Sequence, residues 1–71
     1  MNGDLQRALG VNLRRIRTEQ GMSQEAFADT VGVHRTYMGG LERGERNVTL
    51  KAVERIAEIV GRDPLDLLRP S

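Results

Sequence analysis

Apolar residues recur every three or four positions along most of the chain, and no stretch alternates with the period of two that marks a strand. The repeat forms five segments that are separated by connections of a few residues. The pattern therefore predicts an all-α protein of five short helices, with approximate bounds 5–20, 24–31, 34–43, 50–60 and 64–68.

The ends of these segments carry residues that satisfy free backbone groups. Ser23, Thr49 and Asp63 each precede a segment and can accept a hydrogen bond from a first-turn N–H, and Asp4 is the candidate cap of the first helix. Pro64 suits the first position of the last helix. Glycine follows four of the segments, where a left-handed residue commonly ends a helix: Gly21, Gly32, Gly44 and Gly61.

A chain of 71 residues makes one small domain, 1–71, with a modest core. It has no Cys and one His, and no carboxylates cluster at ligand spacing, so we expect no metal and no other cofactor. Residues 1–10 lack the basic and apolar regions of a signal peptide, and no apolar run approaches the roughly 20 residues of a membrane helix. We therefore expect a cytoplasmic protein without a membrane partner.

The net charge of +1, from 11 basic and 10 acidic residues, does not by itself indicate nucleic acid. All the basic residues except Lys51 are Arg, whose planar guanidinium matches phosphates and guanine edges. A GC-rich genome would produce the same bias. Any attraction for a polyanion must therefore come from a local patch.

The predicted helices 24–31 and 34–43 are joined by a very short turn at Gly32, which is the geometry of a helix-turn-helix over about 23–43. The second helix of that unit lies in the major groove, with its first residues at the base edges. Arg35 can bind guanine O6 and N7, and Thr36 can reach a base or a thymine methyl. The predicted DNA-binding residues, several of them phosphate contacts, are Gln24, His34, Arg35, Thr36, Tyr37, Arg43, Arg46 and Asn47.

Two adjacent glycines, Gly39 and Gly40, lie inside the predicted recognition helix, and each costs about 1 kcal/mol relative to Ala. Gly40 lies one turn beyond Thr36 on the same face, so we interpret it as a point where the groove wall approaches the helix backbone. Gly39 could serve the same purpose against the preceding helix or the DNA backbone. The alternative is that the glycines break the helix after one and a half turns.

These residues form part of a longer pattern that resembles the phage-repressor/Cro-type helix-turn-helix family from about Val11 to Leu68. The matching residues are Ser23-Gln24-Glu25, Phe27-Ala28, Gly32-Val33, Met38, Leu41-Glu42-Arg43-Gly44, Leu50, Ile56-Ala57 and Leu67-Leu68. The segment RTYMGGLERGERNVTLKAVERIA is similar to the controller proteins of restriction–modification systems. The resemblance implies a lambda-repressor-like fold, homodimers on palindromic operators, and a buried ion pair between Arg17 and Glu42.

The final turn carries Leu65, Leu67 and Leu68, which are too many apolar residues for one turn to bury against so small a body. They either complete the core or pair with other apolar residues across a two-fold axis. The predicted dimer interface consists of Ile59, Val60, Leu65 and Leu68. In such a dimer the two recognition helices would lie about 34 Å apart, one turn of DNA.

The sequence therefore indicates a bacterial or phage transcription regulator whose partners are double-stranded DNA and a second copy of itself. Because the chain ends soon after the last predicted helix, we expect no small-molecule effector. The alternative is an antitoxin-like or other protein-interaction module on the same helical fold. An enzyme is not expected, because a chain of 71 residues has little room for a pocket that excludes water.

Overall fold

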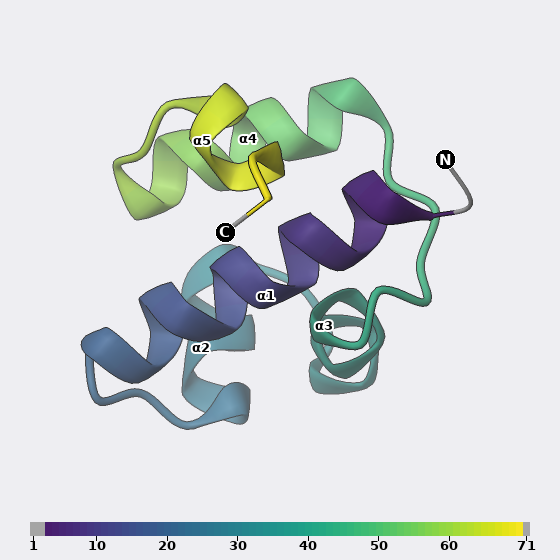
Figure 1. The fold of residues 1–71 in the computed structure, drawn as a ribbon. Coiled ribbons are helices and arrows are strands. Elements are labelled where there is room, and N and C mark those ends of the chain that lie inside the picture. The colour runs from purple at the N-terminus through teal and green to yellow at the C-terminus, as the bar shows by residue number, and fades with distance from the viewer. Residues whose placement is uncertain (1–2, 71) are drawn as a thin grey trace.

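The computed structural model describes residues 3–70, and this part of the chain is helical without any strand. The helices are α1 Asp4–Glu19, α2 Gln24–Val31, α3 Arg35–Glu42, α4 Leu50–Val60 and α5 Pro64–Leu68. Figure 1 shows α1 crossing the middle of the molecule, with α2 and α3 on one side and α4 and α5 on the other. The predicted all-α fold of five short helices is confirmed.

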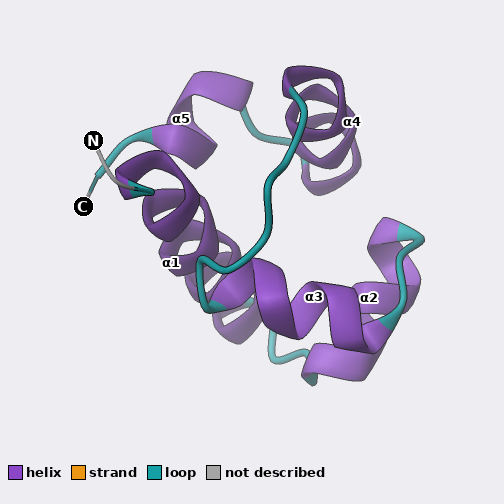
Figure 2. Ribbon diagram, turned by 90° about the vertical axis from the view of Figure 1, so that its right-hand side faces the viewer, coloured by secondary structure: helices purple, strands orange, loops and turns teal. Residues whose placement is uncertain are grey.

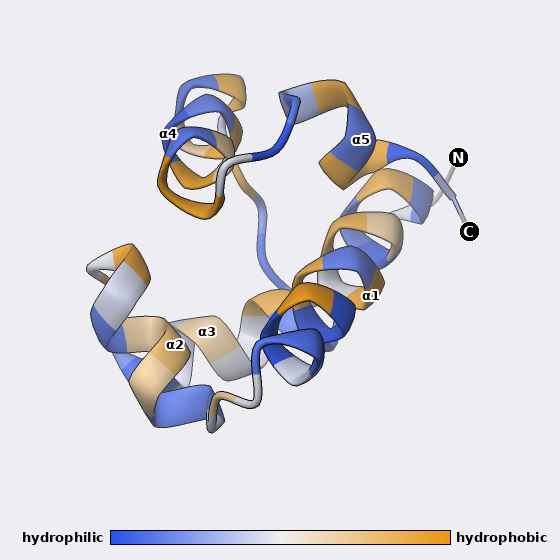
Figure 3. Ribbon diagram, turned by 90° about the vertical axis from the view of Figure 1, so that its left-hand side faces the viewer, coloured by the Kyte–Doolittle hydropathy of each residue, from blue (hydrophilic) through white to orange (hydrophobic). Residues whose placement is uncertain are grey.

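One hydrophobic core lies between the helices, because each contributes an apolar stripe. Figure 3 shows hydrophobic and hydrophilic stretches alternating along the helices, as amphipathic packing requires. Phe27 and Leu13 lie at its centre with no exposed surface. The core also contains Leu9, Ile16, Ala28, Val31, Met38, Leu41, Val53, Ile56, Ala57 and Leu67.

Three predicted N-caps are confirmed. Ser23, Thr49 and Asp63 each accept a hydrogen bond from a backbone N–H in the first turn of α2, α4 and α5. The prediction for α1 is wrong, because Gly3 occupies the cap position and no side chain among residues 3–70 caps this end. Asp4 is instead the first helical residue, where its carboxylate faces the positive end of the helix dipole and pairs with Arg7.

The apolar stripe of α4 extends beyond the core. Leu50 is apolar but 76% exposed, because it is the first residue of the helix. The three leucines of α5 also separate: Leu67 is buried, Leu68 is half-buried against the core and Leu65 is 68% exposed. Part of the apolar surface at this end of the molecule therefore remains uncovered in the monomer.

The buried Asn12 joins α1 to the end of α5, a contact that the sequence did not indicate. Its Nδ2 donates to the carbonyl oxygens of Leu67 at 2.8 Å, Arg69 at 2.9 Å and Asp66 at 3.2 Å. Carbonyls in the last turn of a helix have no partner within that helix. Asn12 therefore acts as a side-chain cap for α5 and fixes the C-terminal segment.

Asn12→Leu should lower the free energy of unfolding by about 1–3 kcal/mol. Leucine has a similar volume, but it cannot donate to the three carbonyl oxygens that Asn12 binds. Urea unfolding measures the difference. Gln20→Leu, at the exposed end of the same helix, is the matched control and should change it by less than about 0.5 kcal/mol. Equal midpoints for the two variants would refute this role for Asn12.

Candidate nucleic-acid interface

The pair α2 and α3 forms the predicted helix-turn-helix. Gly32 ends α2 in the left-handed conformation at a φ of 85°, and its N–H donates to the Ala28 carbonyl at 2.8 Å. The next N–H, of Val33, donates to the same oxygen at 3.0 Å. This tight reversal brings the start of α3 to the surface while its inner side packs Met38 and Leu41 into the core. Figure 2 shows α3 at the edge of the molecule, beside α2.

The start of α3 presents two polar side chains to solvent. Arg35 and Thr36 are both exposed. Within residues 3–70 neither side chain forms a hydrogen bond or an ion pair. An unengaged guanidinium and hydroxyl on the first turn of a projecting helix have the donors and acceptors that base edges recognise.

The sequence predicted that His34 is the first residue of this helix. In the structure His34 lies just before α3. Its Nδ1 accepts a hydrogen bond from the Thr36 N–H at 3.1 Å and so caps the helix. A neutral imidazole that accepts at Nδ1 carries its proton on Nε2. The capping role therefore leaves one donor with which His34 can contact DNA.

Helix α3 continues through both glycines to Glu42, so the predicted alternative of a broken helix is wrong. Both glycines are buried, and side chains of the protein itself cover them. A Cβ on Gly40 would lie 2.7 Å from Arg46 Nε and 2.9 Å from Arg46 Cγ. In the free protein Arg46 fills the space over Gly40, so the predicted approach of the groove wall there stays a prediction.

Gly39 lies under two other predicted DNA contacts. A Cβ there would be 3.1 Å from Arg43 Nη1 and 3.3 Å from Gln24 Oε1. The glycine pair thus allows polar side chains from α2, from the end of α3 and from the following loop to lie close against the recognition helix. Of the two partners that the sequence left open for Gly39, the structure shows α2, but only through the far end of the Gln24 side chain.

A buried ion pair holds the helix-turn-helix to α1. Arg17 donates to both carboxylate oxygens of Glu42, at 2.8 and 3.0 Å, and to the Met22 carbonyl at 3.1 Å. The side chains are only 15% and 5% exposed, which confirms the pair that the family resemblance implies. The hydrogen bonds to Glu42 raise the pKa of Arg17 above its ordinary value.

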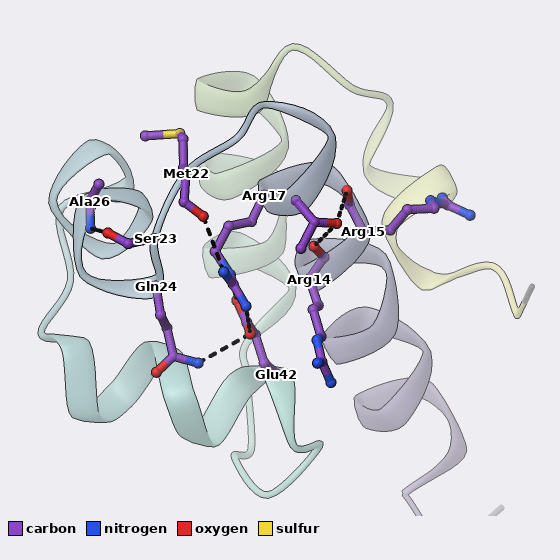
Figure 4. Close-up of polar contacts among 9 residues, drawn as sticks. Arg14, Arg15, Arg17, Met22, Ser23, Gln24, Ala26 and Glu42 are labelled. Atoms are coloured by element: carbon purple, nitrogen blue, oxygen red, sulfur yellow. Dashed lines mark hydrogen bonds and ion pairs between the residues drawn. The ribbon is translucent and has the colours of Figure 1, made fainter.

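Gln24 joins the same cluster, as Figure 4 shows. Its Nε2 donates to Glu42 Oε1 at 3.1 Å, so Glu42 orients a side chain that was predicted to contact a phosphate. Close packing supports this arrangement, because a Cβ on Gly10 of α1 would lie 2.4 Å from the Leu41 carbonyl oxygen of α3. The sequence analysis did not identify Gly10, since a helical glycine alone does not reveal what approaches it.

The loop after α3 contributes the remaining predicted contacts. Arg46 Cζ lies 5.5 Å from the centre of the half-buried Tyr37 ring, a cation–π geometry. Arg43 pairs with Glu45 at 3.0 Å on the surface. Asn47 Oδ1 accepts a hydrogen bond from Gln6 Nε2 at 2.6 Å, which ties the loop to α1 through a residue that the sequence analysis missed.

The predicted dimer residues divide into two kinds. Ile59 is 39% exposed and Leu65 is 68% exposed, whereas Val60 and Leu68 are half-buried and pack against the core.

In the part of the chain described, no group of three or more His, Cys, Asp or Glu side chains is placed to hold a metal ion. No helix between residues 3 and 70 is long and apolar enough to cross a bilayer.

A family model described as a helix-turn-helix domain matches residues 8–69. The chain belongs to this family of DNA-binding transcription regulators. The match includes all of α2, α3, α4 and α5, and with them every predicted DNA-binding residue.

Two characterised relatives of this helix-turn-helix protein are control proteins. C.BamHI of Bacillus amyloliquefaciens is 41% identical over 69 residues, which cover 96% of this chain and 85% of that protein. C.SmaI of Serratia marcescens is 40% identical over 65 residues, which cover 92% and 77%. Both relatives are named as control proteins and neither as an enzyme, in agreement with the prediction from the sequence.

Solved structures show the same fold. A hypothetical transcription factor NHTF from Neisseria superposes with a TM-score of 0.84 at 36% identity, covering 93% of this chain and 76% of that one. The restriction–modification controller protein C.AhdI from Aeromonas hydrophila gives a TM-score of 0.75 at 40% identity, covering 87% and 90%. The all-α architecture and its DNA-binding class thus have support from both sequence and structure.

Proposed function

We propose that residues 1–71 form one DNA-binding domain that acts as a homodimer on a palindromic operator, in the manner of a restriction–modification controller protein. The first turn of α3 enters the major groove, where Arg35 reads a guanine and Thr36 an adjacent base. The observation that carries the proposal is the unengaged, exposed pair Arg35 and Thr36 on a helix whose opposite side is locked into the core.

Polar side chains on both sides of this turn supply contacts that position the protein on the duplex. Gln24 and Arg43 lie over Gly39 on one side, and Arg46 lies over Gly40 on the other. Asn47 keeps its amide NH₂ for a phosphate, because its hydrogen bond with Gln6 uses the side-chain oxygen. Such contacts fix register and orientation but carry little sequence information.

Regulation would follow from where the operator lies relative to a promoter. A bound dimer can block polymerase or recruit it from an adjacent site, and no cofactor enters either step. A protein that acts on an operator works where the DNA is, so we place it in the bacterial cytoplasm. Dimer concentration and operator occupancy would then set the response.

Selection of binding sites from random duplexes, combined with a salt titration, tests the proposal. It should yield a two-fold symmetric consensus whose half-sites are separated by about one helical turn, roughly 10 base pairs. Affinity should fall steeply as salt rises, because Arg–phosphate contacts release counterions. Recovery of an asymmetric site, or of no preferred sequence, would overturn the proposal.

The exposed apolar residues Ile59 and Leu65 support a dimer interface on α4 and α5. A monomer of this size buries a small core, and pairing these residues across a two-fold axis would remove apolar surface from water. Val60 and Leu68 would lie at the base of that interface, since each already contacts the core.

Leu65→Asp should shift the protein from dimer to monomer in sedimentation velocity, because each of two symmetry-related sites gains a charge in an apolar contact. Leu50→Asp is the matched control, since Leu50 is similarly exposed, begins α4 and is not among the four residues of the proposed interface. The control should sediment as the wild type does. If only Leu50→Asp dissociates the dimer, the interface lies on the other end of α4.

A further inference from the structure

Directly after α3 the chain reverses and runs back along this helix. Gly44 has a φ of 74°, and its N–H donates to the Leu41 carbonyl at 3.1 Å. The Glu45 N–H donates to the Gly40 carbonyl at 2.9 Å. This pair of bonds is the Schellman motif, which reverses direction within two residues. The backbone of Arg46 therefore lies beside the last turn of α3, and its side chain extends back over that helix.

Two features of α3 receive the Arg46 side chain. Its stem lies on Gly40, where Cγ, Cδ and Nε would be 2.9, 3.3 and 2.7 Å from a Cβ. Its guanidinium stands over the Tyr37 ring at 5.5 Å. We call Gly40 and the Tyr37 ring together the Arg46 seat. A long flexible side chain that would otherwise be free in solvent is thereby held close to α3.

We propose that Gly40 is a positioning residue for DNA binding: its missing side chain lets the Arg46 seat hold the guanidinium beside the recognition turn before DNA arrives. The inference rests on the proposed function, since Arg46 must contact the duplex for its placement to matter. Ordering a long side chain in advance lowers the conformational entropy lost on binding. The unfavourable helix propensity of glycine at this position lowers the stability of the fold, whereas the gain is in the free energy of binding.

The neighbouring Gly39 supplies a matched comparison. A Cβ at either position improves helix propensity by the same amount. At Gly39 the added atom meets only the far ends of Arg43 and Gln24, at 3.1 and 3.3 Å, and these ends can move aside. At Gly40 it meets Arg46 from Cγ outward, so the whole stem must leave the seat. The two Ala variants therefore separate a general effect on the helix from displacement of Arg46.

A double-mutant cycle on the selected operator tests the inference. Arg46→Ala should weaken binding about tenfold per half-site, the size of one charge-assisted contact, and Gly40→Ala about five- to tenfold per half-site. Gly40→Ala should cause no further loss when Arg46 is already Ala, and Gly39→Ala should remain within about twofold of the wild type. An equal loss from Gly40→Ala in both backgrounds would show that DNA itself approaches Gly40, and the inference would be wrong.

NMR of the free protein supplies a readout that needs no DNA. The δ protons of Arg46 should show an upfield ring-current shift from Tyr37, which Gly40→Ala removes and Gly39→Ala keeps. Absence of that shift in the wild type would overturn the seat even if the protein binds its operator. Conversely, a wild type that shows the shift but binds no duplex specifically would refute the proposed function and leave the seat intact. Urea unfolding checks that both glycine variants remain folded.

Discussion

Glu42→Ala should lower the free energy of unfolding by about 3 kcal/mol, because it leaves the guanidinium of Arg17 largely buried without its counter-charge. Arg17 would retain only the Met22 carbonyl as a partner, at 3.1 Å. The loss also frees Gln24 from the carboxylate that orients it. Urea or thermal unfolding of the variant and the wild type measures the change.

Glu45→Ala is the matched control for this prediction. Its carboxylate pairs with Arg43 at 3.0 Å, but both side chains are about 60% exposed, so water screens the pair. Surface pairs of this kind contribute at most about 1 kcal/mol. If Glu42→Ala were no more destabilising than Glu45→Ala, the buried pair would not be a determinant of the fold.

Arg35→Ala should weaken binding to the selected operator by about 1–3 kcal/mol per half-site and relax the preference at one base pair. The physical reason is the loss of a bidentate contact with guanine, for which Ala offers no replacement. Binding to duplexes that carry each of the four base pairs at every consensus position identifies the pair that Arg35 reads. The same pair should change in both half-sites, because a homodimer applies the same contact twice.

Arg62→Ala removes the same charge from the connection between α4 and α5, well away from α3 (Figure 1). Arg62 lies on the surface near Glu19, with 3.6 Å between the charged atoms. The control should reduce affinity slightly and leave base preference unchanged, as a distant charge in salt solution does. Equal losses for the two variants would mean that Arg35 acts through net charge rather than by reading a base.

The helices and most of their ends were predictable because local interactions determine them. Ser23, Thr49 and Asp63 cap helices through their own neighbours, and Gly32 ends α2 by its own conformation. The prediction for Asp4 failed at a helix end where the adjacent Gly3 takes the cap position. Helix boundaries were therefore predictable wherever one residue at the end of the helix satisfies the free backbone groups there.

Contacts between distant parts of the chain were predictable only through the family resemblance. The resemblance identified the pair of Arg17 and Glu42, whose spacing in sequence alone gives no indication of contact. Asn12 is a polar residue in a helix, and nothing local distinguishes a buried Asn from an exposed one. Its role depends on where α5 ends, which is a property of the folded chain.

The glycine pair shows that residue spacing can indicate a close approach without identifying what approaches. The sequence indicated that something approaches α3 closely at Gly40, and the structure shows such an approach. What approaches is Arg46, because the reversal at Gly44 directs the loop back over the helix. The three-dimensional course of that loop could not be derived from residue spacing, so Arg46 was not foreseen as the side chain that covers Gly40.

The central claim is that the first turn of α3 meets base edges in the major groove, and an NMR titration with the selected duplex tests it most directly. We expect the largest amide shift changes, and the intermolecular contacts to base protons, on Arg35, Thr36 and the start of α2. Residues of α5 and the outer side of α1 should change little. Contacts concentrated on those outer surfaces, with α3 unaffected, would contradict the account.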